Sequence, residues 1–465
     1  MSPCEPLPSH QIPRSHAALP RLSAFGVTSN GFLPEEAPID RLQSPNYEPW
    51  ETLIRHLPES LQEGTLRAKV NSLPTLSASH LTTEPEWRRA YLILCMLTHA
   101  YIWGGDTPCE ILPPPLSLPL LRVSSHLGLP PVATYASLNL WNFRSTSPTL
   151  DFSNLDALEA QHTMTGTPDE SWFYMVSVAM EAHAAPIIPT MLHALDVAQQ
   201  PYPEEDSHGI ITYALEKLTQ CIDEIGQILE RMDEKCDPQV FFHRIRPFLA
   251  GSRNMAAAGL PRGVFYDEGE GKGEWRQLRG GSNGQSSLVQ FLDAVLGVEH
   301  SARGSSAPDT KTPQPHGSET VSFHEEVRGY MPAPHRLFLE YVTKIGGGGG
   351  MRKAITSLPK TETATVELRE AFRRATAALT EFRNKHLRIV TRYIIVPSRQ
   401  QGMGRDGGTG GGMGLGTGAV VTNLATASAS ARAAGAELTG TGGTALLPFL
   451  KQTRDETARA GERVR

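Results

Sequence analysis

The chain has 465 residues, of which 39% are hydrophobic and 20% charged, so it can bury a sizeable core over most of its length. Dividing this length by about 150 residues per domain predicts two or three domains. The formal net charge of −6 argues against a dedicated nucleic-acid binder, which needs a basic surface. The five cysteines include no CxxC pair, which argues against a disulfide framework, a thiolate zinc site and covalently attached haem.

Targeting and membrane-spanning segments are not expected. Residues 1–22 are rich in Pro, Ser and His and lack the apolar core of a secretory signal. The longest apolar stretch, residues 90–103, is shorter than a membrane span and contains Thr98 and His99, so it predicts a buried helix. We therefore expect a cytoplasmic protein in a reducing compartment, with neither a membrane nor a nucleic acid as partner.

Five segments have apolar residues at intervals of three and four, a spacing that predicts helices. They are residues 87–102, 171–184, 209–233, 286–298 and 365–395. The last is the longest, and we expect it to end at Pro397, because proline cannot continue a helix. Convincing strand alternation is rare. The sequence therefore predicts an all-α protein with proline-rich connections, notably over residues 108–131.

A change of composition near residues 104–150 divides the chain. We expect a small helical N-terminal domain over residues 1–135, with a disordered proline-rich start, and a large helical domain over residues 136–465. Residues 301–320 are polar with almost nothing to bury, and residues 402–418 contain ten glycines before an Ala/Thr/Ser-rich run. Two disordered inserts are therefore expected, at residues 301–320 and 402–436.

The HExxH and Walker A motifs are absent from the sequence. The loop GGSNGQSS at residues 280–287 is glycine-rich, but its spacing is not a phosphate-binding fingerprint. It is either a helix N-terminus capped by Ser286 or Ser287, or a tight polar turn whose backbone amides approach a ligand. The residues alone leave both interpretations open.

Two residues on predicted helices invite a functional interpretation. His386 occupies the apolar face of the longest helix, as an ordinary core histidine does, or as an axial ligand to haem iron would. Arg246 lies among apolar residues in PQVFFHRIRPFL. Such an arginine extends to the surface or pairs with a carboxylate of the protein, unless it binds the carboxylate of a ligand.

Several segments together resemble the indoleamine 2,3-dioxygenase family. FRNKHLRIVTRYIIVPSRQQ (382–401) is similar to the segment that carries the family's proximal histidine. Seven other segments resemble further parts of the family's sequence, and they occur along the chain in the family's order: AYIWG (100–104), LPPVATYASL (129–138), FYMVSVAMEAHAAPIIPT (173–190), VFFHRIRPFL (240–249), GGSNGQSS (280–287), VRGYMPAPHRLFL (327–339) and GTGGTALLPFLK (440–451). The inserts resemble those of a fungal member.

The resemblance implies a two-domain, all-α fold with haem b bound in the large domain. It implies that the protein opens the indole ring of L-tryptophan with O₂ to give N-formyl-L-kynurenine, in tryptophan catabolism and NAD biosynthesis through the kynurenine pathway. It also implies an electron donor that keeps the iron ferrous, and a monomer.

The resemblance also assigns site residues. His386 corresponds to the proximal iron ligand, and Arg383 and Asp293 to an ion pair behind it. Arg246 corresponds to the residue at the substrate carboxylate, and the residues at the indole correspond to Phe241 and Phe173. The distal side of the family's site is lined by residues that correspond to Tyr135, Leu138 and Ser177, and the loop near the haem by residues that correspond to Ser282, Asn283 and Gly284. Thr441 corresponds to a residue on a mobile loop over the substrate ammonium. No protein general base is implied.

Some residues depart from the family's pattern. The loop over residues 398–440 is long and glycine-rich, Asn283 stands where a small residue is common, Leu138 and Tyr174 vary the distal lining, and His243 adds a polar group near Arg246. The alternatives are therefore a haem-binding paralogue with weak tryptophan activity, acting on another indole or as a sensor, and a helical interaction protein without a cofactor.

Overall fold

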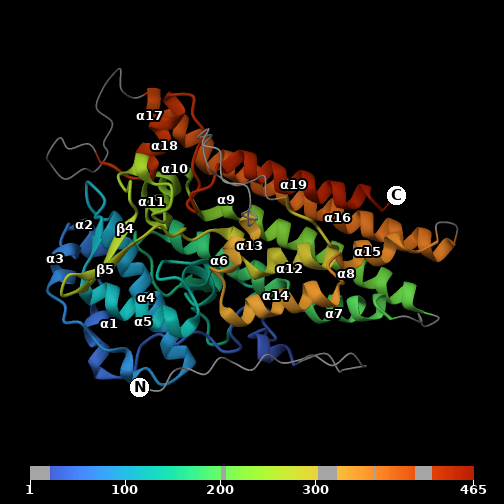
Figure 1. The fold of residues 1–465 in the computed structure, drawn as a ribbon, viewed down its shortest axis with the longest axis horizontal. Helices are drawn as coiled ribbons and strands as arrows, with labels where there is room; N and C mark the ends of the chain where they lie inside the picture. Colours follow the sequence, from blue (N-terminus) through green and yellow to red (C-terminus); the bar gives the residue numbers. More distant parts are fainter. Residues whose placement is uncertain (1–20, 201–205, 302–321, 360–361, 404–420, 465) are drawn as a thin grey trace.

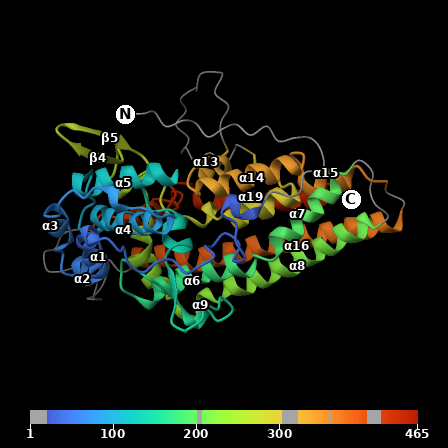
Figure 2. The same ribbon diagram turned by 90° about the horizontal axis from the view of Figure 1, so that it is seen from below.

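The computed structural model describes residues 21–200, 206–301, 322–359, 362–403 and 421–464. The long helices of the C-terminal two thirds lie side by side, with α8 and α16 adjacent in both views (Figures 1 and 2). The helices of this region are α6 (Pro168–His183), α7 (Ile187–Ala198), α8 (Ser207–Glu230), α9 (Met232–Lys235), α10 (Pro238–Val240), α11 (Arg246–Leu249), α12 (Ser287–Leu296), α13 (Phe323–Arg328), α14 (Ala333–Ile345), α15 (Gly350–Thr356), α16 (Thr363–Val390), α17 (Val396–Met403), α18 (Leu424–Ala433) and α19 (Leu446–Glu462).

The N-terminal third packs at one end of these helices (Figure 1). It contains α1 (Glu48–Arg55), α2 (Leu57–Gln62), α3 (Leu66–Asn71), α4 (Glu84–Trp103) and α5 (Pro114–Leu127). Two small sheets complete the fold. In the first, β4 (Val264–Gly269) pairs in parallel with β1 (Ile111–Leu112) and antiparallel with β5 (Lys272–Arg276); in the second, β2 (Phe143–Ser145) pairs antiparallel with β3 (Leu158–Ala160).

The predominantly helical fold predicted from the sequence is confirmed, with the two small sheets in addition. Helices α4, α6, α8, α12 and α16 each cover most of one predicted segment. The start of α12 follows the capping interpretation, because Ser286 accepts a hydrogen bond from the backbone amide of Val289. Its end is a glycine, Gly297, in the left-handed conformation.

Two expectations about proline are wrong. Residues 114–127 form helix α5, which accommodates Pro119 in its interior, so residues 108–131 are not simply a connector. Pro397 does not end the long helix, because residues Thr391–Ile395 form a π-helical turn and α17 continues beyond them. A π turn already breaks the regular hydrogen-bond ladder there, so the missing N–H of a proline in the next turn is tolerated.

The prediction of disorder over residues 402–436 is also wrong where the structure describes this segment. Residues 424–433 form helix α18, which Asn423 caps by accepting hydrogen bonds from the amides of Ala425 and Thr426. Leu424 and Ala425 are buried against the core. The insert at 302–320, residues 404–420 and the chain start up to residue 20 lie outside the described residues.

The buried apolar side chains form two clusters. One contains α4, α5 and α6 with residues 232–266, 390–395 and 424–438, and the other contains α7, α8, α12, α14 and most of α16. A domain boundary at residue 135 stays a prediction.

Among the described helices, no single one is long and apolar enough to cross a membrane. Helices α6 and α7 reach the required length and hydropathy only together, as a pair bent by 43°.

Candidate active site

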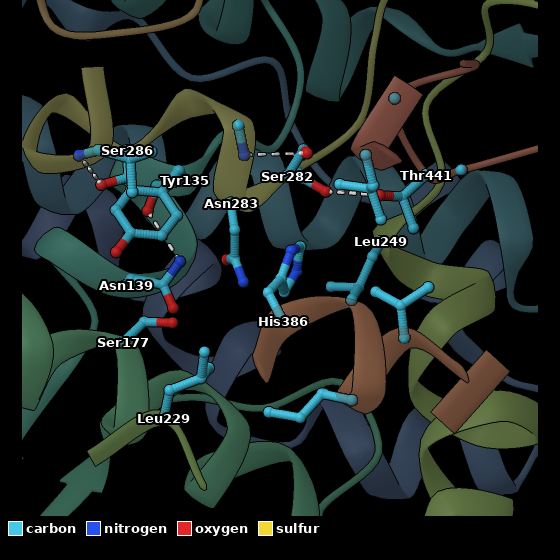
Figure 3. A pocket seen from close by; sticks show the side chains of 18 of the residues that line it. Tyr135, Asn139, Ser177, Leu229, Leu249, Ser282, Asn283, Ser286, His386 and Thr441 are labelled. Carbon is cyan, nitrogen blue, oxygen red and sulfur yellow. Dashed lines mark hydrogen bonds between the residues drawn. The ribbon is translucent and has the colours of Figure 1, made fainter. Parts of the chain in front are cut away.

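A cavity lies where the two apolar clusters meet. Its volume open to the centres of water molecules is about 230 Å³, far more than the roughly 10–15 Å³ that one water needs. Every site residue expected from the sequence lines it except Asp293. Figure 3 shows His386 between two groups of lining residues, with Tyr135, Asn139 and Ser177 on one side and Leu249 and Thr441 on the other.

His386 projects into the cavity from α16, and Asn283 lies beside it in the view of Figure 3. Burial lowers the pKa of His386 to about 4, and the positive charge of Arg383 contributes to this lowering. The imidazole is therefore neutral at physiological pH, which is the form that binds a metal. A single neutral imidazole on a long helix beside an apolar cavity fits the proximal side of a haem site.

Arg383 and Asp293 form the ion pair that the resemblance implied. Nη2 of Arg383 lies 2.7 Å from each carboxylate oxygen of Asp293, and both side chains are buried. Burial alone would raise the pKa of Asp293, but the charges of Arg383 and His300 outweigh it and lower the pKa well below its usual range. The pair joins α12 to α16 one turn before His386, so it can hold the ring in a fixed orientation.

Arg246 is fully buried and has no carboxylate partner within salt-bridge distance in the described part of the chain. Its Nη1 donates to Oγ of Ser428 at 2.9 Å and its Nη2 to the carbonyl oxygen of Thr439 at 2.6 Å, whereas its buried Nε has no partner. Burial lowers the pKa of Arg246 to about 9. A desolvated cation with unused donors, facing a cavity, is a binding group for an anion.

Ser428 and Thr439 were missed because both lie in the region expected to be disordered or mobile. The signal was present in the sequence, since Asn423 followed three residues later by Thr426 forms a capping box at the start of α18. Ser428 and Thr439 therefore hold Arg246 in place, although neither of them lines the cavity.

The turn over residues 439–444 closes the cavity on this side. Oγ1 of Thr441 donates to the carbonyl oxygen of Gly281 at 2.9 Å, and the carbonyl oxygen of Thr441 accepts from the amides of Gly251 and Gly280. A Cβ atom on Gly251 would lie 2.2 Å from the backbone nitrogen of Gly280, so this close approach of two backbone segments requires glycine. The turn thereby lies against the loop that contains Ser282, Asn283 and Gly284.

Aromatic rings form the apolar wall. The ring centroids of Phe173 and Phe241 are 5.0 Å apart, and those of Phe241 and Tyr393 are 5.7 Å apart in an edge-to-face contact. Such a wall favours a flat aromatic ligand. His243 does not line the cavity: its ring packs edge-on against Phe242, so the expectation that it adds polarity beside Arg246 is wrong.

A buried polar cluster lies on the side away from Thr441. The hydroxyls of Tyr135 and Ser286 donate to Oε1 of Glu181 at 3.0 and 2.7 Å, and burial raises the pKa of Glu181 to about 7 despite these donors. Nδ2 of Asn139 donates to the carbonyl oxygen of Tyr135, so its Oδ1 faces the cavity without a donor. Sequence reasoning missed Glu181 and Asn139, because each occupies a position that reads as ordinary helix interior.

These features define the protein as a helical haem enzyme with a site for a small anionic aromatic molecule. The sequence model of the indoleamine 2,3-dioxygenase family matches residues 21–460. An indoleamine 2,3-dioxygenase of Penicillium citrinum is 37% identical over 94% of this chain and 88% of the relative. The indoleamine 2,3-dioxygenase of Saccharomyces cerevisiae is 36% identical over 94% of this chain and 93% of the relative. The 6-hydroxytryptophan 2,3-dioxygenase of Fusarium equiseti is 36% identical over 92% of this chain and 94% of the relative.

The chain belongs to the indoleamine 2,3-dioxygenase family, as its sequence resemblance predicted. It is a dioxygenase that uses O₂ and a tryptophan-like indole, and its cofactor is haem b. The neutral imidazole of His386 in an apolar cavity fits that cofactor. When bound, ferrous haem supplies the activation of O₂, and the protein supplies binding and orientation.

Proposed function

We propose that the protein opens the indole ring of L-tryptophan with O₂ to give N-formyl-L-kynurenine, the reaction that begins tryptophan catabolism toward NAD. The observation that carries this proposal is Arg246, a fully buried guanidinium without a carboxylate partner in the described part of the chain. An amino acid substrate brings a carboxylate, and a buried guanidinium binds and orients such a group.

The remaining site residues take roles that agree with their positions. His386 would hold the haem iron, while Arg383 and Asp293 orient its ring. Phe173 and Phe241 would enclose the indole, and Thr441 would lie at the substrate ammonium. The others line the haem edge and the distal side: Tyr135, Leu138, Ser177, Ser282, Asn283 and Gly284.

Turnover by the haem-loaded protein tests the proposal. The reduced protein is mixed with L-tryptophan and air, and the absorbance of N-formylkynurenine is followed. We expect product formation by the wild type and a large loss in an Arg246→Met variant. Arg244→Met is the matched control, because this exposed arginine lies two residues before Arg246, in the π turn Phe241–Ile245. A haem spectrum without product from the wild type would overturn the proposed substrate.

A second candidate substrate is an indole amino acid with a hydroxyl on its ring. Oδ1 of Asn139 and Oε2 of Glu181 are buried without hydrogen-bond partners among the described residues. Asn139 lies at the side of the cavity away from Thr441 (Figure 3), and Glu181 is bonded to Tyr135 and Ser286 on that side. The hydroxyls of Tyr135 and Ser286 already donate to Oε1 of Glu181, and the Asn139 amide donates to the carbonyl oxygen of Tyr135. A substrate hydroxyl would satisfy an empty acceptor that otherwise costs about 1–3 kcal/mol. The relative from Fusarium equiseti is named for 6-hydroxytryptophan.

Competition between L-tryptophan and 6-hydroxy-L-tryptophan distinguishes the two candidates. If the hydroxylated substrate is the better one, an Asn139→Leu variant should lose about tenfold in relative kcat/KM for it, because it loses the acceptor. An unchanged ratio in that variant would remove the second candidate.

We further propose, from the sequence alone, that the protein works as a monomer of two domains, residues 1–135 and 136–465, and receives electrons from a separate donor. We also propose a cytoplasmic location, which agrees with four unpaired cysteines among the described residues. Light scattering of the purified protein tests the monomer.

A further inference from the structure

A second histidine lies behind the Arg383–Asp293 pair. His300 follows α12, and its Nε2 is 3.0 Å from Oδ2 of Asp293 while its Nδ1 is 2.8 Å from Oε2 of Glu456 on α19. The side chains of all three residues are at most 9% exposed. The imidazole therefore bridges two buried carboxylates from two different helices.

This arrangement requires the charged form of His300. A neutral imidazole carries one N–H and would turn a lone pair toward one of the carboxylates, whereas the imidazolium donates to both. Burial alone would lower the pKa of His300, but Asp293 and Glu456 outweigh it and raise the pKa. Four buried charges thus alternate in sign from Arg383 through Asp293 and His300 to Glu456, and these four balance. Arg459, which is 58% exposed, lies 3.9 Å from Oε1 of Glu456, where solvent screens its charge.

The far end of this row is firmly held. Oε1 of Glu456 accepts hydrogen bonds from the amide of Ser301 at 3.0 Å, from its hydroxyl at 2.7 Å and from Nε2 of Gln452 at 2.9 Å. Burial alone would raise the pKa of Glu456, but these donors and His300 lower it to about 2. The row therefore connects α19 and the end of α12 to the helix that carries His386.

A metal ion does not suit this cluster, although Asp293, His300 and His324 bring three ligand atoms within 4.8 Å of one another. Both nitrogens of His300 already face carboxylates, and both oxygens of Asp293 face Arg383. The rings of His300 and His324 stack with centroids 3.7 Å apart and planes 11° from parallel. Their in-plane lone pairs therefore run side by side and do not converge on one point.

We propose that His300 and Glu456 are positioning residues for the proximal side of the haem site: they fix Asp293 and, through Arg383, the helix turn that presents His386, and their balanced charges set the electrostatic potential there. This inference rests on the proposed role of His386. Removing the charge of His300 leaves one excess negative charge, which favours ferric over ferrous iron. Removing the charge of Glu456 leaves one excess positive charge, which favours ferrous iron.

The reduction potential of the bound haem tests this inference, because merely structural damage has no preferred sign. At pH 6 we expect His300→Gln to lower the potential and Glu456→Gln to raise it. The double variant should return toward the wild-type value, because it removes one charge of each sign. A unit charge on the order of 10 Å away, at an effective dielectric constant of about 20, changes the Fe(III)/Fe(II) ratio roughly tenfold, which is about 59 mV.

The groups that face His300 at this pH are Asp293 of α12, Arg383 of α16, Glu456 of α19 and His324 of α13. His324 stays neutral, since burial lowers its pKa to about 3. Glu299→Gln is the matched control: this carboxylate belongs to the same loop and to two ion pairs, but it is 62% exposed, so its loss should leave the potential unchanged.

Three results would overturn the inference. The first is an unchanged potential in folded His300→Gln and Glu456→Gln variants that bind haem normally. The second is a shift of the same sign in both, with no return in the double variant. The third is stabilisation of the wild type, but not of His300→Gln, by Zn²⁺, which would make the cluster a metal site. If His300→Gln fails to fold, the sign of the shift in Glu456→Gln decides. A wild type that takes up no haem would instead refute the proposed function.

Discussion

Replacing Arg246 with methionine should weaken substrate binding and, at the same time, stabilise the protein. The guanidinium is fully buried, and burial lowers its pKa from the ordinary value of arginine to about 9. At about 1.4 kcal/mol per pKa unit, burial destabilises the charged form by about 5 kcal/mol. Methionine removes that charge and fills a similar volume, so the buried cation no longer opposes folding.

The gain is smaller than the whole 5 kcal/mol, because two hydrogen bonds are lost. Arg246 donates to Ser428 and to the carbonyl oxygen of Thr439, and hydrogen bonds from a charged donor contribute about 1.5 kcal/mol each. We therefore expect a net stabilisation of about 2 kcal/mol. For a chain of 465 residues this raises Tm by roughly 2 °C.

Loss of the carboxylate partner should cost about 3 kcal/mol of binding, which lowers kcat/KM for L-tryptophan about 150-fold. Steady-state kinetics and calorimetry of haem-loaded Arg246→Met and Arg244→Met measure both effects. The control should match the wild type in each. An unchanged KM in Arg246→Met would refute the carboxylate role, and a lower Tm would refute the argument from burial.

The pH dependence of this stabilisation has a definite sign. The folded-state pKa of Arg246 lies below the unfolded value, so the destabilisation is complete below about pH 9 and is relieved as the pH rises above 9 toward the unfolded pKa of arginine. The advantage of Arg246→Met should therefore be constant over neutral pH.

Three further variants probe other parts of the site. His386→Ala should lose stable haem binding, because the variant lacks the imidazole proposed to hold the iron; a full Soret band after gel filtration would remove its assignment as iron ligand. Ser428→Ala should lower kcat/KM for L-tryptophan about fivefold, the loss of about 1 kcal/mol of Arg246 orientation; wild-type kinetics would show that α18 does not position the guanidinium. Glu181→Gln should gain stability relative to the wild type as the pH rises from about 4.5 to 7, because the buried carboxyl keeps its proton to about pH 7 whereas the unfolded one loses it near 4.5. Over this range the gain reaches about 3 kcal/mol. Denaturant titrations at pH 5 and pH 8 measure the free energies of unfolding, and an equal difference between variant and wild type at both pH values would contradict the prediction.

Local pattern determined most of the helices and the direction in which His386 points. Helix faces follow from the spacing of apolar residues, which depends only on residues within a few turns. The expected segment over residues 365–395 therefore placed His386 on the inward face of what became α16. The motif GGSNGQSS offered Ser286 or Ser287 as a helix cap beside a second interpretation, and the structure shows Ser286 as the cap of α12.

Where local rules failed, contacts between distant residues decided. Pro397 was expected to end a helix, but a π turn lets the chain continue. Composition predicted disorder for residues 424–433, but packing of Leu424 and Ala425 against the core supports α18. A glycine-rich neighbourhood does not reveal that an adjoining segment has an apolar face to bury.

The electrostatic state of the site was decided only by the tertiary structure. The sequence places Arg246, Glu181, Asn139 and His300 on their elements, but says nothing about which charges face them. Arg246 became a buried cation without a carboxylate, and His300 became a bridge between Asp293 and Glu456, 163 residues apart in the chain. The physical reason is that desolvation and Coulomb energies depend on distances in space, which local sequence does not encode.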